Sequence, residues 1–144
     1  MNKGEGDPAP EWGHLRKVRK MEKRKKILLV DDSKTALLMA SLILKKGPYD
    51  VVTAEDGEDA LRRTAAEHPD LILMDVVMPK MTGFEACREL RKQAATKAIP
   101  IIMLTTRGES SNLETGFESG CTDYVTKPID SLVLLAKVKD CLRD

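Results

Sequence analysis

The clearest indication of the fold is the sequence Ile27-Leu28-Leu29-Val30-Asp31-Asp32. Four apolar residues in a row, without the alternation of a half-buried strand, predict a strand that is buried on both faces, as in a parallel sheet. A second stretch has the same form, because Leu71-Ile72-Leu73-Met74 is also wholly apolar and is followed directly by Asp75. The two stretches therefore predict buried strands that each end in acidic side chains.

The rest of the chain from residue 27 alternates short apolar runs with amphipathic segments. Further strands are predicted at 49–54, 100–104 and 122–125. Helices are predicted at 33–46, 57–67, 82–92, 109–119 and 130–142. Five strand–helix units in a row predict an α/β fold in which one five-stranded parallel sheet is covered by helices on both faces.

Composition and charge divide the chain into two parts. Its 144 residues are 42% hydrophobic and 33% charged, which fits one soluble globular domain. Residues 1–26 carry nine Lys or Arg and four Asp or Glu, a net charge of +5, whereas residues 27–144 carry fifteen and nineteen, a net charge of −4. We therefore expect a basic arm over residues 1–26 and a single domain over residues 27–144.

The location expected from the sequence is the cytoplasm. No apolar run approaches the roughly 20 residues that cross a bilayer, and the polar first residues lack the apolar core of a secretory signal. The three cysteines are far apart and show no metal-binding spacing, which fits reduced thiols in a reducing compartment.

The residues that follow the predicted strands form a candidate functional site. In parallel α/β sheets the working site lies at the carboxyl ends of the strands, where this chain has Asp31, Asp32, Asp75, Thr105 and Lys127. Carboxylates that share one crevice repel each other unless a cation lies among them, and Mg²⁺ suits oxygen ligands that leave room for a phosphate. Asp75 can act as a nucleophile toward a phosphoryl group, whose oxygens Lys127, Mg²⁺ and the hydroxyl of Thr105 can stabilise.

With these residues in this order, the chain resembles the receiver domains of bacterial response regulators. The resemblance covers about residues 26–143. The matching residues are Ile27 to Ser33, Leu73 to Pro79, Gly83, Thr105 and Lys127-Pro128. It implies the flavodoxin-like, doubly wound (βα)5 receiver fold with strand order 2-1-3-4-5, which is the order of the family's chemotaxis member.

The resemblance also implies a metal and phosphorylation site. Asp75 matches the phosphoacceptor of the family. Asp31 and Asp32 match the acidic pair that positions Mg²⁺, with Asp32 as the expected direct ligand. The backbone carbonyl of Val77 is expected to complete the metal site.

A second implied group of residues reads out phosphorylation. Lys127 matches the cation that pairs with the phosphate, and the peptide bond before Pro128 is expected to be cis, which would aim that lysine. Thr105 and Tyr124 match the switch pair of the family, a hydroxyl and an aromatic ring that move inward on phosphorylation. The surface of residues 109–142 is expected to change with them.

The resemblance predicts a signalling switch rather than an enzyme with its own substrate. A histidine kinase or phosphotransfer protein is the expected donor, and the phosphorylated form is expected to bind a target protein through the surface of residues 109–142. Such a domain assists its own phosphotransfer and autodephosphorylation. Because the chain ends soon after the last predicted helix, we expect no output domain in it.

Two other functions are weighed against the switch. The first is a pseudo-receiver that acts as an interaction module without phosphorylation, which the intact set of five site residues argues against. The second is a hydrolase with an aspartate nucleophile on the same kind of fold. Haloacid-dehalogenase-like hydrolases carry a DxDx(T/V) pattern after the first strand, and this chain has no such pattern there.

The basic arm has four open interpretations. Its segment 15–26, LRKVRKMEKRKK, holds eight basic residues and one acid, and Leu15, Val18 and Met21 recur every three residues. The segment can be a solvated tail, a docking element for a protein partner, or a patch that binds nucleic acid or a membrane surface. In the fourth interpretation the natural chain begins at Met21.

Overall fold

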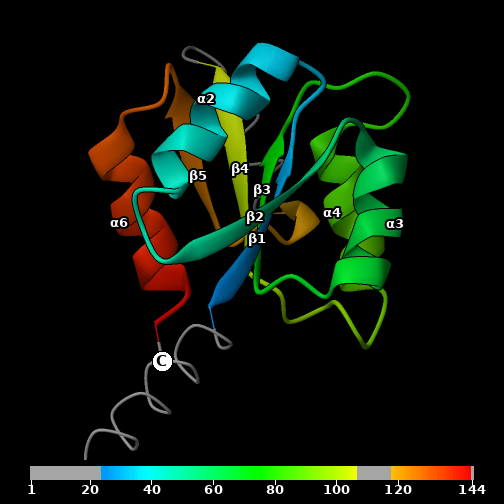
Figure 1. Cartoon of the computed structure of the whole chain (residues 1–144). Coiled ribbons are helices and arrows are strands. Elements are labelled where there is room, and N and C mark those ends of the chain that lie inside the picture. Colours follow the sequence, from blue (N-terminus) through cyan, green and yellow to red (C-terminus); the bar gives the residue numbers. More distant parts are fainter. Residues whose placement is uncertain (1–23, 107–117, 144) are drawn as a thin grey trace, which may run out of the picture.

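The computed structural model of the chain describes residues 24–106 and 118–143. In these residues strands and helices alternate along the chain from β1 to β4, and β5 and α6 lie in the second described part (Figure 1). The strands are β1 (Lys25–Val30), β2 (Tyr49–Ala54), β3 (Leu71–Asp75), β4 (Ile101–Thr106) and β5 (Asp123–Lys127). The helices are α2 (Lys34–Leu44), α3 (Gly57–Glu67), α4 (Gly83–Arg91) and α6 (Ser131–Cys141).

The five strands form one parallel sheet in the order β2-β1-β3-β4-β5. This confirms the predicted α/β fold and the strand order that the resemblance implies. Strand β1 begins two residues before its apolar run, at Lys25, which pairs with Tyr49 of β2. The predicted helix at 109–119 lies outside the described residues, apart from its last two positions.

The core has two layers, one on each face of the sheet. On one face α3 and α4 cover Leu28 and Val30 of β1, and on the other α2 and α6 cover Ile27 and Leu29 (Figure 1). Successive side chains of a strand point to opposite faces, so all four residues are fully buried. This is why the runs Ile27–Val30 of β1 and Leu71–Met74 of β3 are apolar at every position rather than at every second one.

Each described helix begins at a side chain that caps it. Ser33, Asp56, Thr82 and Asp130 each accept a hydrogen bond from a backbone N–H in the first turn of α2, α3, α4 and α6 respectively. Because these caps directly follow the loops at the carboxyl ends of the strands, they also fix the loops that carry the candidate site.

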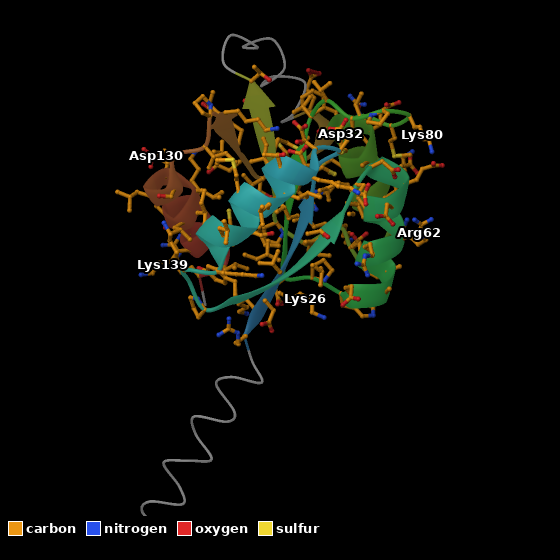
Figure 2. The ribbon with its side chains drawn as sticks, turned by 45° about the horizontal axis from the view of Figure 1, so that its top comes forward. Lys26, Asp32, Arg62, Lys80, Asp130 and Lys139 are labelled. Carbon is orange, nitrogen blue, oxygen red and sulfur yellow. The ribbon has the colours of Figure 1, made fainter. Side chains whose placement is uncertain are left out.

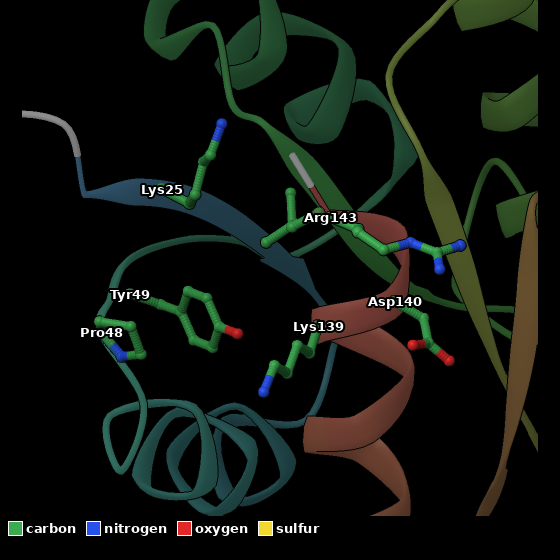
Figure 3. A pocket seen from close by; sticks show the side chains of 7 residues that line it. Lys25, Pro48, Tyr49, Lys139, Asp140 and Arg143 are labelled. Atoms are coloured by element: carbon green, nitrogen blue, oxygen red, sulfur yellow. The ribbon is translucent and has the colours of Figure 1, made fainter.

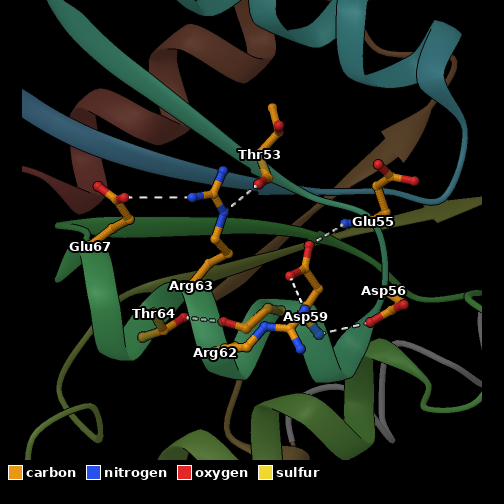
Figure 4. A network of polar contacts seen from close by, with 9 residues as sticks. Thr53, Glu55, Asp56, Asp59, Arg62, Arg63, Thr64 and Glu67 are labelled. Carbon is orange, nitrogen blue, oxygen red and sulfur yellow. Dashed lines mark hydrogen bonds and ion pairs between the residues drawn. The ribbon is translucent and has the colours of Figure 1, made fainter.

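A polar network ties α3 to the edge strand β2 (Figure 4). The Nε of Arg63 donates to the backbone oxygen of Thr53 over 3.1 Å, and the Glu55 N–H donates to Asp59 over 3.3 Å. Asp59 also pairs with Arg62, which lowers the pKa of the Asp59 carboxyl. These contacts are largely exposed, so we expect them to orient α3 more than they stabilise the fold.

Arg91, at the end of α4, joins this helix to the loops at the amino ends of β4 and β5. Its guanidinium donates to the backbone oxygens of Gly120 (2.8 Å), Ile99 (2.7 Å) and Lys97 (3.1 Å). Gly120 has a φ of 101° and lies against the Arg91 side chain, where a Cβ would come within 2.8 Å of Cγ. One side chain thus joins α4 to the segments that precede β4 and β5.

We expect Arg91→Met to lower the free energy of unfolding by about 3 kcal/mol, because the charge-assisted hydrogen bonds of the guanidinium are lost. Urea unfolding followed by far-ultraviolet circular dichroism measures the change. The matched control is Lys92→Met, whose ion pair with Glu89 is exposed and should contribute less than about 1 kcal/mol. Equal losses in the two variants would contradict the role given to Arg91.

Two further features concern the thiols and the membrane. Cys87 is buried, Cys121 and Cys141 are partly buried, and all three are free thiols. Burial raises the pKa of Cys121 to about 11, so this thiol is protonated at neutral pH. Among the described residues, no helix is both long and apolar enough to span a bilayer.

Candidate functional site

The carboxyl ends of four strands bring the predicted site residues together. Asp31 and Asp32 directly follow β1, and Asp75 is the last residue of β3. The register places Asp75 opposite Leu104 of β4, one residue before Thr105, and Thr106 opposite Lys127 of β5. Asp32 marks this end of the sheet in Figure 2, away from Lys26 and Lys139 at the other end.

Three carboxylates form a cluster at this end of the sheet. Asp31, Asp32 and Asp75 each offer an oxygen, and these oxygens lie within 4.8 Å of one another. Asp31 is only 2% exposed and Asp75 8%, whereas Asp32 faces solvent. The cluster therefore has two buried members and one that stands at the mouth of the site.

Lys127 lies between the two buried carboxylates. Its Nζ is 3.0 Å from Oδ2 of Asp31 and 3.4 Å from Oδ2 of Asp75. The other oxygen of Asp31 accepts the N–H of Ser33 over 2.9 Å, so Asp31 is held from both sides. The peptide bond between Lys127 and Pro128 is cis, as the resemblance predicted.

Burial and the neighbouring charges have opposite effects on the pKa values of Asp75 and Lys127. Burial raises the pKa of the Asp75 carboxyl above its usual value, even though the positive charge of Lys127 acts to lower it. Burial acts to lower the pKa of Lys127, but the hydrogen bond with Asp31 and the charge of Asp75 outweigh it, so this pKa is raised. At neutral pH the ammonium of Lys127 is therefore charged.

The raised pKa of Asp75 has a direct consequence for stability. A carboxyl whose pKa is higher in the folded state binds more protons there than in the unfolded chain. Asp75 therefore makes the domain less stable as the pH rises through the range between its pKa in the unfolded chain and its pKa in the folded domain. Ionisation of Asp75 therefore costs stability, at a position where a neutral side chain would be more favourable.

Gly83 lets helix α4 begin against the end of β3. Its N–H donates to the backbone oxygen of Val76 over 2.9 Å. A Cβ at this position would collide with the backbone oxygen of Asp75. Only glycine fits here without moving the loop that carries Asp75, which explains the requirement for Gly83 in the sequence pattern.

The donor set of the cluster suits a hard divalent cation. All three ligand atoms are carboxylate oxygens, and the exposed position of Asp32 leaves one side open to water. Mg²⁺ is bound in proteins by one or a few carboxylates and keeps several waters. Repulsion among three carboxylates with one ammonium nearby also favours an added positive charge. The residues present therefore fit Mg²⁺.

Thr105 and Tyr124 lie on the neighbouring strands β4 and β5. Thr105 is buried and Tyr124 is partly buried. Thr105 is 3% exposed and follows the residue that pairs with Asp75. Tyr124 packs at the edge of the core beneath α3 and α4, and the Nζ of Lys137 lies 4.9 Å from the centre of its ring. The ring is thus linked to α6 by a cation–π contact.

An apolar surface beside the site was missed from the sequence. Three large side chains of α2, Leu38, Met39 and Leu42, are about 60% exposed. A pocket of about 230 Å³ next to them is lined by Met39, other α2 residues and the segment Lys127 to Ile129. Because α2 is apolar on all sides, its spacing does not tell the buried face from the exposed one, although an all-apolar helix on a small domain does indicate a contact surface.

Comparisons with known proteins agree with this geometry. The family model described as the response regulator receiver domain matches residues 27–139. Protein PilH of Pseudomonas aeruginosa is 41% identical over 81% of this chain and 97% of its own length. The alkaline phosphatase synthesis transcriptional regulatory protein PhoP of Bacillus subtilis is 44% identical over 83% of this chain, which spans only about half (49%) of that relative.

A solved structure shows the same fold. It is the receiver domain of the sensor histidine kinase PA1611 from Pseudomonas aeruginosa, with a magnesium ion coordinated in its active site cleft. It is 30% identical, covers 84% of this chain and 99% of its own length, and superposes with a TM-score of 0.78. On the match of the family model, the sheet order and these relatives, the chain belongs to the response regulator receiver domain family.

Proposed function

We propose that this receiver domain is a phosphorylation-dependent switch of a bacterial two-component system, and that it accepts a phosphoryl group on Asp75. The observation that carries the proposal is the buried carboxylate of Asp75, held among two other carboxylates and 3.4 Å from the ammonium of Lys127. The expected donor is a histidine kinase or a phosphotransfer protein. The expected location is the cytoplasm, with residues 1–26 as a basic arm.

In this proposal each side chain of the site has its own task. An oxygen of Asp75 attacks the phosphorus, and the bond to the donor breaks as the new anhydride forms. Lys127 is placed to neutralise one phosphoryl oxygen, and the hydroxyl of Thr105 to donate to another. Bound Mg²⁺, held by Asp31, Asp32, Asp75 and the Val77 carbonyl, would supply the remaining positive charge. The magnesium ion in the related kinase receiver domain supports this assignment.

The switch is proposed to act through Lys127, Thr105 and Tyr124. Lys127 pairs with Asp31 and Asp75, so a phosphoryl group on Asp75 competes for its ammonium. A hydrogen bond to the phosphoryl group draws the Thr105 hydroxyl inward and leaves space for the Tyr124 ring. Lys137 of α6 lies over that ring. Movement of the ring therefore changes the surface of β5 and α6, where the target protein is expected to bind.

The phosphodonor is proposed to dock on α2. The exposed side chains of Leu38, Met39 and Leu42 stand beside the site, and the adjoining pocket is shared with Lys127. An apolar surface of this kind is typical of a protein-binding face. A donor that covers it brings its phosphorylated side chain to the mouth of the site.

Mg²⁺ is expected to stabilise the domain, and Asp32 is expected to be needed for it. At a free Mg²⁺ concentration ten times the Kd, binding to the folded state alone should add about 1.4 kcal/mol. Asp32→Asn should weaken binding about tenfold and reduce this gain to about 0.4 kcal/mol at the same concentration. Thermal unfolding with and without Mg²⁺ measures the effect, with Asp140→Asn as a control for an exposed carboxylate elsewhere. The same gain in both variants would count against the proposed metal site.

The proposed function is tested with beryllofluoride, which mimics a phosphoryl group on aspartate. In the presence of Mg²⁺ we expect beryllofluoride to raise the melting temperature of the full chain and to change the tyrosine environment. Sedimentation velocity on the same samples shows whether the activated form dimerises. A folded protein that does not respond to beryllofluoride and Mg²⁺ would instead be the pseudo-receiver, an interaction module that acts without phosphorylation.

A further inference from the structure

A pocket of about 520 Å³ opens at the amino ends of β1 and β2, at the end of the domain away from the carboxylate cluster (Figure 3). We call it the Tyr49 pocket. Sites for small molecules commonly have volumes of roughly 300 to 1,000 Å³, so this pocket is large enough for such a ligand. Its lining comes from the start of β1, the start of β2 and the end of α6, and consists of Lys25, Pro48, Tyr49, Lys139, Asp140, Leu142 and Arg143.

The aromatic ring of Tyr49 forms a fixed apolar wall of the pocket. Tyr49 and Leu142 both pack against the core layer beneath α2 and α6. Gly47 lies so close to the ring that an added Cβ would come within 2.7 Å of its Cε2 atom. The backbone is held as well, because the carbonyl of Tyr49 accepts a hydrogen bond from Arg24 over 3.0 Å. The ring is only partly buried, so it offers apolar surface to a ligand.

Two polar groups of the pocket are available to a ligand. Among the described residues, neither the hydroxyl of Tyr49 nor the ammonium of Lys139 has a hydrogen bond or ion pair. Figure 3 shows the two side chains extending from β2 and α6 into the space between these elements. Burial raises the pKa of the Tyr49 hydroxyl, so at neutral pH it is protonated and can donate. Both groups are therefore donors, which suits an anionic ligand.

The charges around the pocket also favour an anion. Lys45 and Lys46, just before Pro48, and Arg143 are exposed, and none of the three has an ion pair within the described parts of the chain. Asp140 is the one acidic residue of the lining, and its side chain is turned away from Tyr49 in Figure 3. The positive potential at the pocket should thus attract a group with more than one negative charge, such as a phosphate.

We propose that the Tyr49 pocket binds a small phosphate ester that carries a planar apolar ring, such as a mononucleotide. The ring of the ligand lies against Tyr49 and Pro48, since a planar base stacks well on an aromatic side chain. The phosphate accepts hydrogen bonds from Lys139, because an ammonium group is a common phosphate binder, and from the Tyr49 hydroxyl. The pocket and Asp75 lie at opposite ends of a parallel sheet, so this proposal does not depend on phosphorylation of Asp75.

The test is nuclear magnetic resonance of the isotope-labelled full chain, titrated with AMP, adenosine or inorganic phosphate. EDTA is present throughout, so that no metal in the carboxylate cluster can bind a phosphate. We expect AMP to shift the amide signals of Tyr49, Lys139 and Leu142 and to leave that of Asp75 unchanged. Adenosine lacks the phosphate and inorganic phosphate lacks the ring, so each should bind at least about tenfold more weakly than AMP.

Single substitutions test the two polar groups. Lys139→Gln should weaken AMP binding about tenfold and leave adenosine binding unchanged. Tyr49→Phe keeps the ring and removes only the hydroxyl, so it should weaken AMP binding about threefold. The control, Lys80→Gln, removes the same charge at the other end of the domain (Figure 2) and should stay within about twofold of the unmodified chain. Lys139 is exposed and unpaired among the described residues, so its substitution should not unfold the domain.

Several results would overturn the proposal. One is the absence of saturable shifts at the pocket below about 10 mM AMP. Equal binding of AMP and adenosine, or of AMP and inorganic phosphate, would show that the phosphate or the ring is not recognised. An equal loss in Lys139→Gln and Lys80→Gln would indicate a net-charge effect. A short single-stranded oligoadenylate that binds at least about tenfold more tightly than AMP would assign the pocket to nucleic acid instead.

Discussion

Replacement of Asp75 by Asn is expected to abolish phosphoryl incorporation from acetyl phosphate and, at the same time, to stabilise the Mg²⁺-free domain. An amide cannot form the anhydride, so labelling should fall at least about a hundredfold. Removing one of three clustered carboxylates relieves repulsion and the burial of a charge, which should add on the order of 1 kcal/mol to the free energy of unfolding.

The two effects are measured on the same protein, by intact mass after incubation with acetyl phosphate and by urea unfolding. Asp140→Asn is the control, because Asp140 is an exposed carboxylate at the other end of the domain. It should change neither quantity. Persistent labelling of Asp75→Asn would place the acceptor elsewhere, and a loss of stability would contradict the electrostatic account of the cluster.

Lys127→Met is expected to destabilise the Mg²⁺-free domain by about 3 kcal/mol, since it leaves the carboxylates of Asp31 and Asp75 without a cation. The side chain of Asp31 is 3% exposed and that of Lys127 28%, so solvent screens this pair only partly. Saturating Mg²⁺ should recover a large part of the loss, because it restores positive charge to the same oxygens.

A double-mutant cycle separates the pair from other effects of the substitution. When Asp31→Asn is already present, Lys127→Met should be milder by at least about 1 kcal/mol. Lys137→Met is the matched control, as Lys137 has similar exposure and an ion pair with Asp123 at 3.0 Å, outside the carboxylate cluster. We expect it to lower stability by less than about 1 kcal/mol. Additive losses in the cycle would show that Lys127 does not act through Asp31.

The closeness of Asp31 and Asp75 was predictable because each directly follows a wholly apolar run. The apolar runs before Asp31 and Asp75 need burial on both faces, which only a parallel sheet covered by helices provides. Once the strands are parallel, the residues after them must gather at one end. The strand order could not be predicted in this way, because all the central strands are equally apolar and no periodicity distinguishes their neighbours. It was implied by the family resemblance alone.

Other contacts depend on tertiary structure and leave no local signal. Nothing near Lys127 in the sequence shows that it lies 3.0 Å from Asp31, 96 residues away. The backbone oxygens bound by Arg91 belong to loops, whose carbonyls are the same for every residue type. The exposed face of α2 was also hidden, because a helix that is apolar on every side has no amphipathic pattern to locate it.

The most direct test of the proposed switch is to locate the phosphoryl group by peptide mapping after the full chain is treated with acetyl phosphate, with Mg²⁺ or with EDTA. We predict a single adduct on the peptide that contains Asp75, formed in Mg²⁺ and absent in EDTA. An adduct at another residue, or equal labelling in EDTA, would show that Asp75 and its neighbouring carboxylates do not form a magnesium-dependent phosphoacceptor.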